Sequence, residues 1–232
     1  MQANISVVIA GAGIGARFGV NLPKQYHKIG NKTVLEHSIK SMQQVFTQST
    51  MVVALNPHDQ WFHTLEIAND SRVIPIRGGE TRGESIWHAL EFLKKSPTPW
   101  VLIHDAVRPC VPQSDIERLV KLAQSHPPGG ILAAPSIDTL KRVQHKKITQ
   151  TVNRNLIWRA LTPQLFEFDK LYFAYEKARK EEIEITDDAY VMELAGLSPY
   201  VVEGSSINIK ITYPHDLKVA SSYLQAKEEI CL

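Results

Sequence analysis

ISVVIAGAGIGAR, residues 5–17, is the stretch that decides the fold. Residues 5–10 are apolar and rich in β-branched side chains, as in a parallel strand buried on both faces. They lead directly into glycines, and because glycine has no Cβ, backbone N–H groups in such a loop can closely surround a polyphosphate. The stretch therefore predicts an α/β fold whose first strand ends in a phosphate-binding loop.

Apolar runs and helical patterns alternate through most of the remaining chain. This alternation is typical of parallel strands joined by crossover helices, and it predicts a mostly parallel sheet. We expect its strands at residues 5–10, 50–55, 72–76, 99–104 and 130–134. Capping boxes at Thr33–Glu36 and Ser114–Glu117 predict the starts of two helices, and residues 86–93 carry the apolar stripe of a third.

The C-terminal part of the chain continues the pattern. We expect helices at 168–181 and from the Thr186 cap to the stop at Gly196, strands around 199–203 and 207–211, and a final helix from Pro214. Asp187 and Asp188 lie in the first turn of the second of these helices, where acidic side chains favour the macrodipole. This predicts a capping role for Asp187 and leaves the role of Asp188 open.

Residues 136–160 have a different pattern. Residues 138–143 and 146–152 look like two strands joined by a polar turn, which predicts a hairpin arm inserted into the α/β layer. An isolated two-stranded hairpin is marginally stable in water, because it cannot bury its faces alone. The arm therefore predicts a partner subunit, on a chain that otherwise forms a single domain over residues 1–232.

Composition narrows the class of protein. The chain of 232 residues is 44% hydrophobic and 22% charged, which is enough to bury one sizeable core. Its net charge of +2 is too small for the dense basic stripe of a nucleic-acid-binding protein. Cys110 and Cys231 lie far apart, which argues against disulfides, and no apolar run is as long as a signal peptide or membrane span needs. We expect a cytoplasmic protein without nucleic-acid or membrane partners.

The glycine loop alone allows two interpretations. Gly11, Gly13 and Ala16 also satisfy the dinucleotide-binding pattern G-x-G-x-x-G/A. A dinucleotide fold, however, needs a helix directly after the loop and an acidic residue about 20 positions on. Here Pro23 favours an extended conformation, and Glu36 is used by the capping box. A Walker loop is excluded as well, since no G-K-[ST] follows the glycines.

What remains is a long glycine loop that carries two cations, Arg17 and Lys24. Most arginines and lysines are solvated surface residues. These two follow the first parallel strand, at the carboxyl edge where α/β folds bind ligands. The arrangement therefore predicts a site for a triphosphate, whose charge redistributes during transfer.

Further stretches support a family resemblance. They are GAGIGAR (11–17) with LPKQY (22–26), HDAVRP (104–109), DTLKR (138–142), VNRN (152–155) with ALTPQ (160–164), and EG (203–204) with NIK (208–210). In order and spacing they resemble the 2-C-methyl-D-erythritol 4-phosphate cytidylyltransferases, from residue 5 to about residue 217. The resemblance implies a Rossmann-like α/β nucleotidyltransferase fold, a homodimer whose arms exchange, and attack by a sugar phosphate on the α-phosphorus of CTP.

Two positions depart from the family pattern. The loop begins with Gly11 where the family usually has alanine, which matters little because the contact is mainly with the backbone. Glu80 stands where some relatives have aspartate. A ribose contact from the Glu80 side chain is therefore less secure than the backbone and Ser85 contacts to cytosine.

The resemblance assigns roles to the matching residues. Arg17 and Lys24 would stabilise the reacting α-phosphorus and the departing pyrophosphate, because positioning and charge stabilisation dominate such transfers. Arg154 and Lys210, which complete the predicted catalytic set, would hold the sugar's phosphate in line. The predicted nucleotide contacts are Ala10, Gly11, Ala12, Gly13, Gly15, Gly79, Glu80, Arg82, Ser85 and Ala106. The predicted acceptor contacts are Asp105, Arg108, Thr139, Arg154, Thr162 and Lys210, with the arm residues supplied by the other subunit.

Asp105 ends the apolar run 100–104, at the carboxyl edge of a strand that reads as central. A carboxylate there typically binds metal or hydroxyls. We assign it to the sugar hydroxyls and, through water, to the Mg²⁺ that we expect as cofactor; loop capping is the competing explanation. His104 is interpreted as a packed or hydrogen-bonded histidine, since the nine histidines show no metal-binding spacing.

Three alternatives stay open. A D-ribitol 5-phosphate cytidylyltransferase would keep the chemistry and change the acceptor. A dinucleotide-dependent oxidoreductase would use the glycine loop differently, and titration with NADH and CTP would separate it from a cytidylyltransferase. A catalytically silent nucleotide-binding regulator is disfavoured, because all four candidate cations are present.

Overall fold

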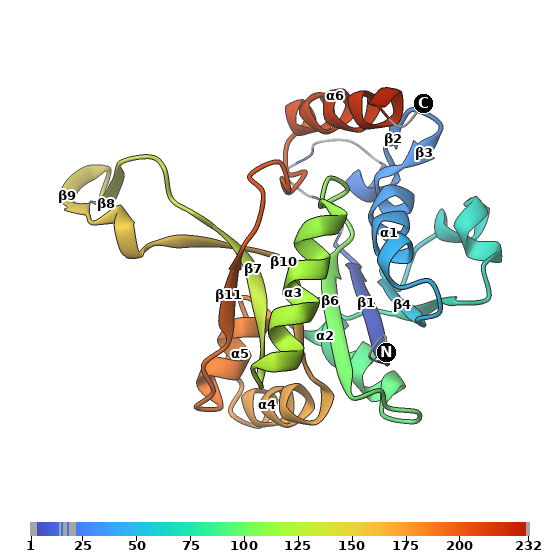
Figure 1. Ribbon diagram of the computed structural model, residues 1–232, viewed down its shortest axis with the longest axis horizontal. Coiled ribbons are helices and arrows are strands. Elements are labelled where there is room, and N and C mark those ends of the chain that lie inside the picture. The colour runs from blue at the N-terminus through green and yellow to red at the C-terminus, as the bar shows by residue number, and fades with distance from the viewer. Residues whose placement is uncertain (1–3, 14, 16–17, 19–21, 231–232) are drawn as a thin grey trace.

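A seven-stranded sheet forms the centre of the described part of the protein (Figure 1). The computed structural model describes residues 4–13, 15, 18 and 22–230. Its strand order is β11-β7-β10-β6-β1-β4-β5. The strands are β1 (Ile5–Gly11), β4 (Met51–Leu55), β5 (Val73–Arg77), β6 (Trp100–Asp105), β7 (Gly129–Pro135), β10 (Trp158–Glu167) and β11 (Tyr200–Glu203). Only β10 runs antiparallel to its neighbours in this sheet, so the predicted mostly parallel α/β fold is confirmed.

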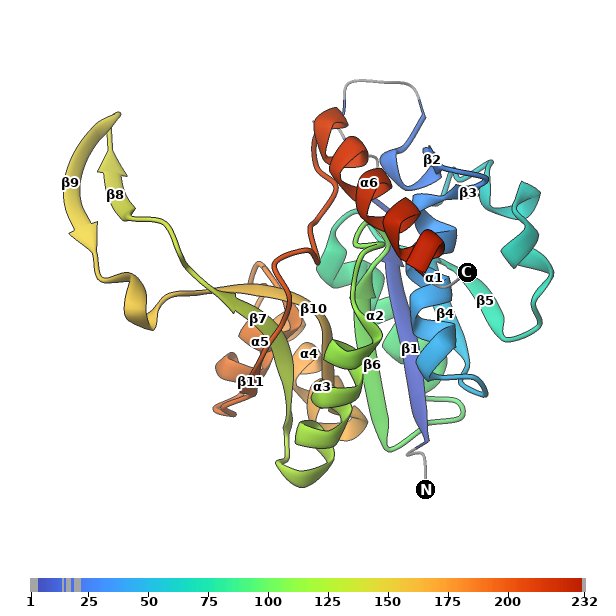
Figure 2. The same cartoon turned by 45° about the horizontal axis from the view of Figure 1, so that its top comes forward.

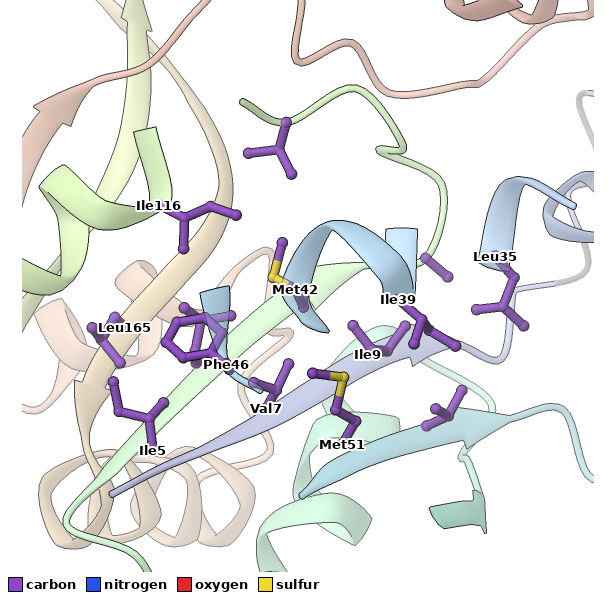
Figure 3. Packing of buried hydrophobic residues seen from close by; sticks show 14 of the residues in the cluster. Ile5, Val7, Ile9, Leu35, Ile39, Met42, Phe46, Met51, Ile116 and Leu165 are labelled. Carbon is purple, nitrogen blue, oxygen red and sulfur yellow. The ribbon is translucent and has the colours of Figure 1, made fainter. Parts of the chain in front are cut away.

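Helices cover both faces of the sheet. Val7 and Ile9 of β1 pack in one core cluster with α1 (Val34–Val45) and α3 (Gln113–Ser125), which lie in front of the sheet in Figure 1. Figure 3 shows this cluster at close range. Val8 belongs to a second cluster, with α2 (Arg82–Leu93), α4 (Phe168–Lys180) and α5 (Asp188–Leu194). Successive strand side chains point to opposite faces, which explains why β1 is apolar at nearly every position.

A third cluster lies near the carboxyl ends of the strands. Phe18, Ile29 and Ala220 belong to it, so that α6 (Pro214–Ile230) packs against the segment that follows β1. Figure 1 shows α6 at this end of the molecule. The short elements are β2 (Lys28–Ile29), β3 (Lys32–Thr33), and the 3₁₀ turns η2 (Lys24–Tyr26), η3 (Phe62–Thr64), η4 (Glu66–Asn69) and η5 (Arg154–Leu156).

The arm projects away from the body of the protein (Figures 1 and 2). It consists of β8 (Leu140–Gln144) and β9 (Lys147–Val152), which pair antiparallel. His145 and Lys146 between them both have positive φ, 49° and 63°, as a tight two-residue hairpin turn requires. The hairpin predicted from the sequence is confirmed. Its role in dimer formation stays a prediction.

Three predictions about local structure were wrong, and one strand, β10, was not predicted at all. Residues 207–211, predicted as a strand, form none. Helix α3 begins after Pro112, so Ser114 lies inside the helix and forms no capping box. Thr186 was predicted as the cap of α5, but the cap is Asp187, whose side chain accepts a hydrogen bond from the Tyr190 N–H. The separate prediction of a capping role for Asp187 is confirmed.

Candidate functional site

A cavity opens at the carboxyl edge of the sheet, where β1 and β6 end. The glycine loop, the start of α2 and the segment before α6 enclose it. Its lining residues are Ala10–Gly13, Lys24, Gln25, Gly79–Arg82, Ser85, Asp105–Val107 and Lys210. The cavity therefore brings together most of the predicted nucleotide contacts, one predicted catalytic cation from each end of the chain, and Asp105.

Gln25 holds the glycine loop in shape. Its buried side-chain amide donates hydrogen bonds to the carbonyl oxygens of Gly11 (2.9 Å) and Gly13 (3.2 Å). Gly15 has φ +70°, and a Cβ at this position would lie 3.2 Å from Cγ of Lys24. The Lys24 stem therefore lies against the loop. Gln25 belongs to the LPKQY motif, but its role could not be predicted, because an amide bonded to backbone carbonyls leaves no pattern in the sequence.

The segment before α2 forms the opposite wall. Thr81 and Glu84 make a capping box, in which the Glu84 carboxylate accepts hydrogen bonds from the N–H groups of Glu80 and Thr81. The Ser85 hydroxyl accepts from the Gly79 N–H (3.1 Å) and donates to the Thr81 carbonyl (2.9 Å). A Cβ on Gly79 would lie 2.3 Å from Cβ of Glu84, so only glycine fits there. This capping box was not predicted from the sequence.

Asp105 is the centre of a charge cluster. Asp105 is 5% exposed, and its carboxylate contacts three cations among the described residues: Lys210 Nζ lies 2.8 Å from Oδ2, Arg82 Nε 3.1 Å from Oδ1, and Arg108 Nε 3.6 Å from Oδ2. Burial by itself raises the pKa of Asp105, but Arg82, Lys210 and Arg108 hold it well below its usual range. Asp105 is thus ionised throughout the physiological pH range, and it holds the cationic side chains together at the floor of the cavity.

Arg108 and Thr162 are buried next to Asp105 rather than in the cavity lining. Arg108 Nη1 donates to the Asn208 carbonyl (2.8 Å), and the Asn208 amide donates to the Thr162 carbonyl (2.8 Å). These contacts attach the segment that carries Lys210 to the sheet. Direct acceptor contacts from Arg108 and Thr162 stay predictions.

A directed chain of hydrogen bonds supports Asp105 from behind. The Arg108 carbonyl can only accept, so His104 Nε2, 3.1 Å away, carries the proton, and Nδ1 accepts from the Thr162 hydroxyl at 3.0 Å. The Thr162 oxygen in turn accepts from the Asp105 N–H at 3.0 Å. His104 is fully buried, and burial lowers its pKa to about 4. The prediction that His104 is a hydrogen-bonded histidine is confirmed.

The neutral state of His104 makes stability depend on pH. In the unfolded chain this histidine titrates near 6.5, and in the folded protein near 4. Between these values the unfolded state binds the additional proton, so acid favours unfolding. We expect His104 to reduce the free energy of unfolding by about 3 kcal/mol as the pH falls from 7 to 4. Urea unfolding of the wild type and of His104→Gln at both pH values measures this, and an equal loss in both proteins would contradict it.

The arm residues Thr139 and Arg154 are exposed and do not line the cavity. Arg154 donates from Nη1 to the Ile137 carbonyl, within the arm. Their predicted role requires the other subunit, and it stays a prediction. Arg17, also predicted as catalytic, lies outside the described residues.

Asp188, whose role the sequence left open, has a definite place in the structure. It is fully buried and pairs with Arg82, with 2.6 Å between Oδ2 and Nη2. Arg82 thus lies between two carboxylates, and the sequence indicated neither of them as its partner.

In the part of the chain that the structure describes, none of the helices combines the length and the apolar character needed to cross a membrane.

Comparisons with known proteins agree on one family. The sequence profile of the 2-C-methyl-D-erythritol 4-phosphate cytidylyltransferases matches residues 5–226. Enzymes of that name from Buchnera aphidicola and Vibrio atlanticus are 41% and 42% identical, over 97% and 99% of this chain and 94% and 98% of theirs. The crystal structure of the Francisella tularensis enzyme superimposes with a TM-score of 0.82 at 33% identity, covering 95% of this chain and 100% of that one.

Proposed function

The chain belongs to the 2-C-methyl-D-erythritol 4-phosphate cytidylyltransferase family, and from this premise we propose that it joins CTP and 2-C-methyl-D-erythritol 4-phosphate. The products are 4-CDP-2-C-methyl-D-erythritol and pyrophosphate, in a step of non-mevalonate isoprenoid precursor biosynthesis. An oxygen of the sugar's phosphate forms a bond to the α-phosphorus of CTP, and the bond between the α-phosphorus and the bridging oxygen of the pyrophosphate breaks. The acceptor is already an anion, so no side chain has to act as nucleophile.

The observation that carries the proposal is the composition of the cavity. One wall is a glycine loop with Lys24 packed against it, and the floor holds Asp105 with Lys210 and Arg82. We assign to Lys24 the stabilisation of the charge that develops on the phosphates, and to Lys210 the binding of the acceptor's phosphate. Fixed cations of this kind need little reorganisation during the reaction, which is why they lower the barrier.

We propose that Mg²⁺ enters the site bound to the triphosphate, with few ligands from the protein. Among the residues that the structure describes, no three His, Cys, Asp or Glu side chains group as a metal site. Mg²⁺ typically keeps several waters and binds one or two carboxylates together with substrate phosphates. Asp105 is the candidate carboxylate, and because cations contact both its oxygens, we propose that it reaches the metal through water. When bound, the metal would offset the repulsion between the two anionic reactants.

We also propose a homodimer formed through the arm. Large apolar side chains of the arm and its stem are exposed to solvent: Ile137, Val143, Ile148, Leu156, Ile157 and Trp158. An apolar surface of this kind marks an interaction site. A second copy would cover this surface and bring Thr139 and Arg154 to the cavity.

The cytoplasmic location stays a prediction.

The structure argues against the dinucleotide-dependent oxidoreductase, because Glu36, the candidate ribose-binding acid, is already bonded within the protein. Glu36 is 6% exposed, and its carboxylate accepts hydrogen bonds from the N–H (2.7 Å) and the hydroxyl (2.9 Å) of Thr33. The capping box predicted from the sequence is confirmed. Glu36 is therefore not available as the acidic partner that NAD-type binding needs.

Pyrophosphate release tests the function. The purified protein with magnesium and CTP is expected to release pyrophosphate with 2-C-methyl-D-erythritol 4-phosphate and not with D-ribitol 5-phosphate. Release only with ribitol phosphate would keep the chemistry and replace the acceptor. Release with neither acceptor would defeat the proposed function.

A further inference from the structure

Asp188 and Tyr175 form a buried pair behind the cavity, and the chemistry described so far does not use them. Both side chains are fully buried, one at the start of α5 and the other on α4. The Tyr175 hydroxyl donates to Asp188 Oδ1 at 2.6 Å, while Oδ2 accepts from Arg82 at 2.6 Å. A buried carboxylate is costly unless it is paired and hydrogen-bonded, so these two contacts determine how Asp188 is held.

Arg82 is thereby anchored at two points. Its Nε donates to Asp105 at the end of β6, and its Nη2 donates to Asp188. The guanidinium is planar, so two anchors on different elements fix both its position and its plane. The remaining nitrogen, Nη1, is buried and has no hydrogen-bond partner among the described residues. The two anchors therefore account for the side-chain hydrogen bonds that Arg82 makes to described residues.

The charges around Arg82 show what the buried pair of Asp188 and Tyr175 contributes. Burial by itself lowers the pKa of Arg82, but the charges of Asp188 and Asp105 raise it well above its ordinary value. Around Asp105, the three cations Arg82, Arg108 and Lys210 face two buried carboxylates. Without the charge of Asp188, Asp105 would be the one carboxylate partner of Arg82 among the described residues. Arg82 and Lys210 would then compete for the same carboxylate.

We propose that Asp188, held by Tyr175, is a positioning residue for the transfer reaction. It keeps Arg82 on Oδ1 of Asp105, which leaves Oδ2 to Lys210 and Arg108. The inference rests on the proposed function for the reaction that this arrangement serves. The hydrogen-bonded chain from Tyr175 to Asp105 is independent of it.

Removing a single hydroxyl tests the chain with little effect on packing. Tyr175→Phe is expected to lower kcat/KM about tenfold, the size expected from one hydrogen bond to a charged group. Tyr172→Phe is the matched control, since Tyr172 lies on the same helix and donates its hydroxyl to a carboxylate, Glu91, outside the network. Tyr172→Phe should retain wild-type turnover. Equal losses in the two variants would overturn the proposal.

A double-mutant cycle separates positioning from general stability. Asp188→Asn alone is expected to lower kcat/KM by up to about 100-fold, the cost of misplacing a group by about 1 Å. In an Arg82→Ala background the same change should cause no further loss, because the residue through which it acts is gone. It should also raise the melting temperature of that background, since the carboxylate it removes is buried and unpaired there. Multiplying losses in kcat/KM would show that Asp188 acts independently of Arg82, and would overturn the proposal.

A measurement without substrates keeps this inference distinct from the proposed function. The exchange of the Arg82 Nε proton with solvent, followed by NMR on the full chain, should be slow in the wild type and in Tyr172→Phe, and faster in Tyr175→Phe and Asp188→Asn. If the wild type releases no pyrophosphate, the proposed function fails, and the exchange rates still decide whether Asp188 and Tyr175 position Arg82. Unchanged exchange in all variants would overturn the positioning role even in an active enzyme.

Discussion

Replacing Lys24 with alanine is expected to lower kcat by about 100- to 1,000-fold, the usual cost of removing one preorganised group that stabilises charge in the transition state. The Lys24 stem packs against Gly15 and the side chain lines the cavity, so the cation is held beside the glycine loop. Its strongest interaction should develop as charge moves onto the departing pyrophosphate. The KM for CTP should therefore change far less than kcat.

Steady-state kinetics with varied CTP at saturating acceptor measure the two constants separately. Lys28→Ala is the matched control, because Lys28 is an exposed lysine on β2, four positions along the chain. It should keep the wild-type kcat. A Lys24→Ala variant with normal kcat and a raised KM for CTP would place Lys24 in ground-state binding instead.

Mixing two inactive chains is expected to restore activity. If Arg154 of the arm completes the site of the other subunit, a Lys24→Ala chain and an Arg154→Ala chain form heterodimers with one intact site and one doubly altered site. Random exchange of equal amounts would give about a quarter of the wild-type activity, since half the dimers are mixed and each has one intact site of two. Pyrophosphate release after subunit exchange measures the recovery.

The control mixture combines Lys24→Ala with Lys210→Ala. Both positions line the cavity in the body of one chain. Every heterodimer then carries a lesion in each site, and the mixture should stay inactive. Recovery in the control mixture, or none with Arg154→Ala after proven exchange, would contradict an arm that reaches across the dimer.

Local patterns in the sequence were sufficient for most of the fold. The strands β1, β4 and β6 and the capped start of α1 each depend on neighbouring residues, and the structure has them where the patterns indicated. Strand β10 was missed because its pattern is irregular. Its first residues are polar or exposed, Pro163 interrupts it, and its pairing with β6 and β7 depends on segments distant in the chain.

In the candidate site, too, local motifs were predicted from the sequence and long-range contacts were not. The glycine loop and the residues around Ser85 and Asp105 were indicated by motifs, and the structure brings them to one cavity. The partners that hold them were not indicated. Arg82 and Asp188 are 106 positions apart, and the Gln25 amide bonds to backbone carbonyls. Contacts of this kind depend on the folded chain as a whole and produce no periodicity or spacing that a sequence displays.

The register of β7 and β10 indicates how the arm relates to the rest of the molecule. Pro135 is paired with Trp158, and Ala134 with Arg159, so the two strands already meet antiparallel before the chain departs into residues 136–157. The arm is therefore an elongated turn between two strands of an otherwise complete sheet. A short turn could replace it without breaking a pair of the central sheet. The residues that form the central sheet and those of the proposed dimerisation arm thus lie in separate segments, so each segment can change in sequence without altering the other.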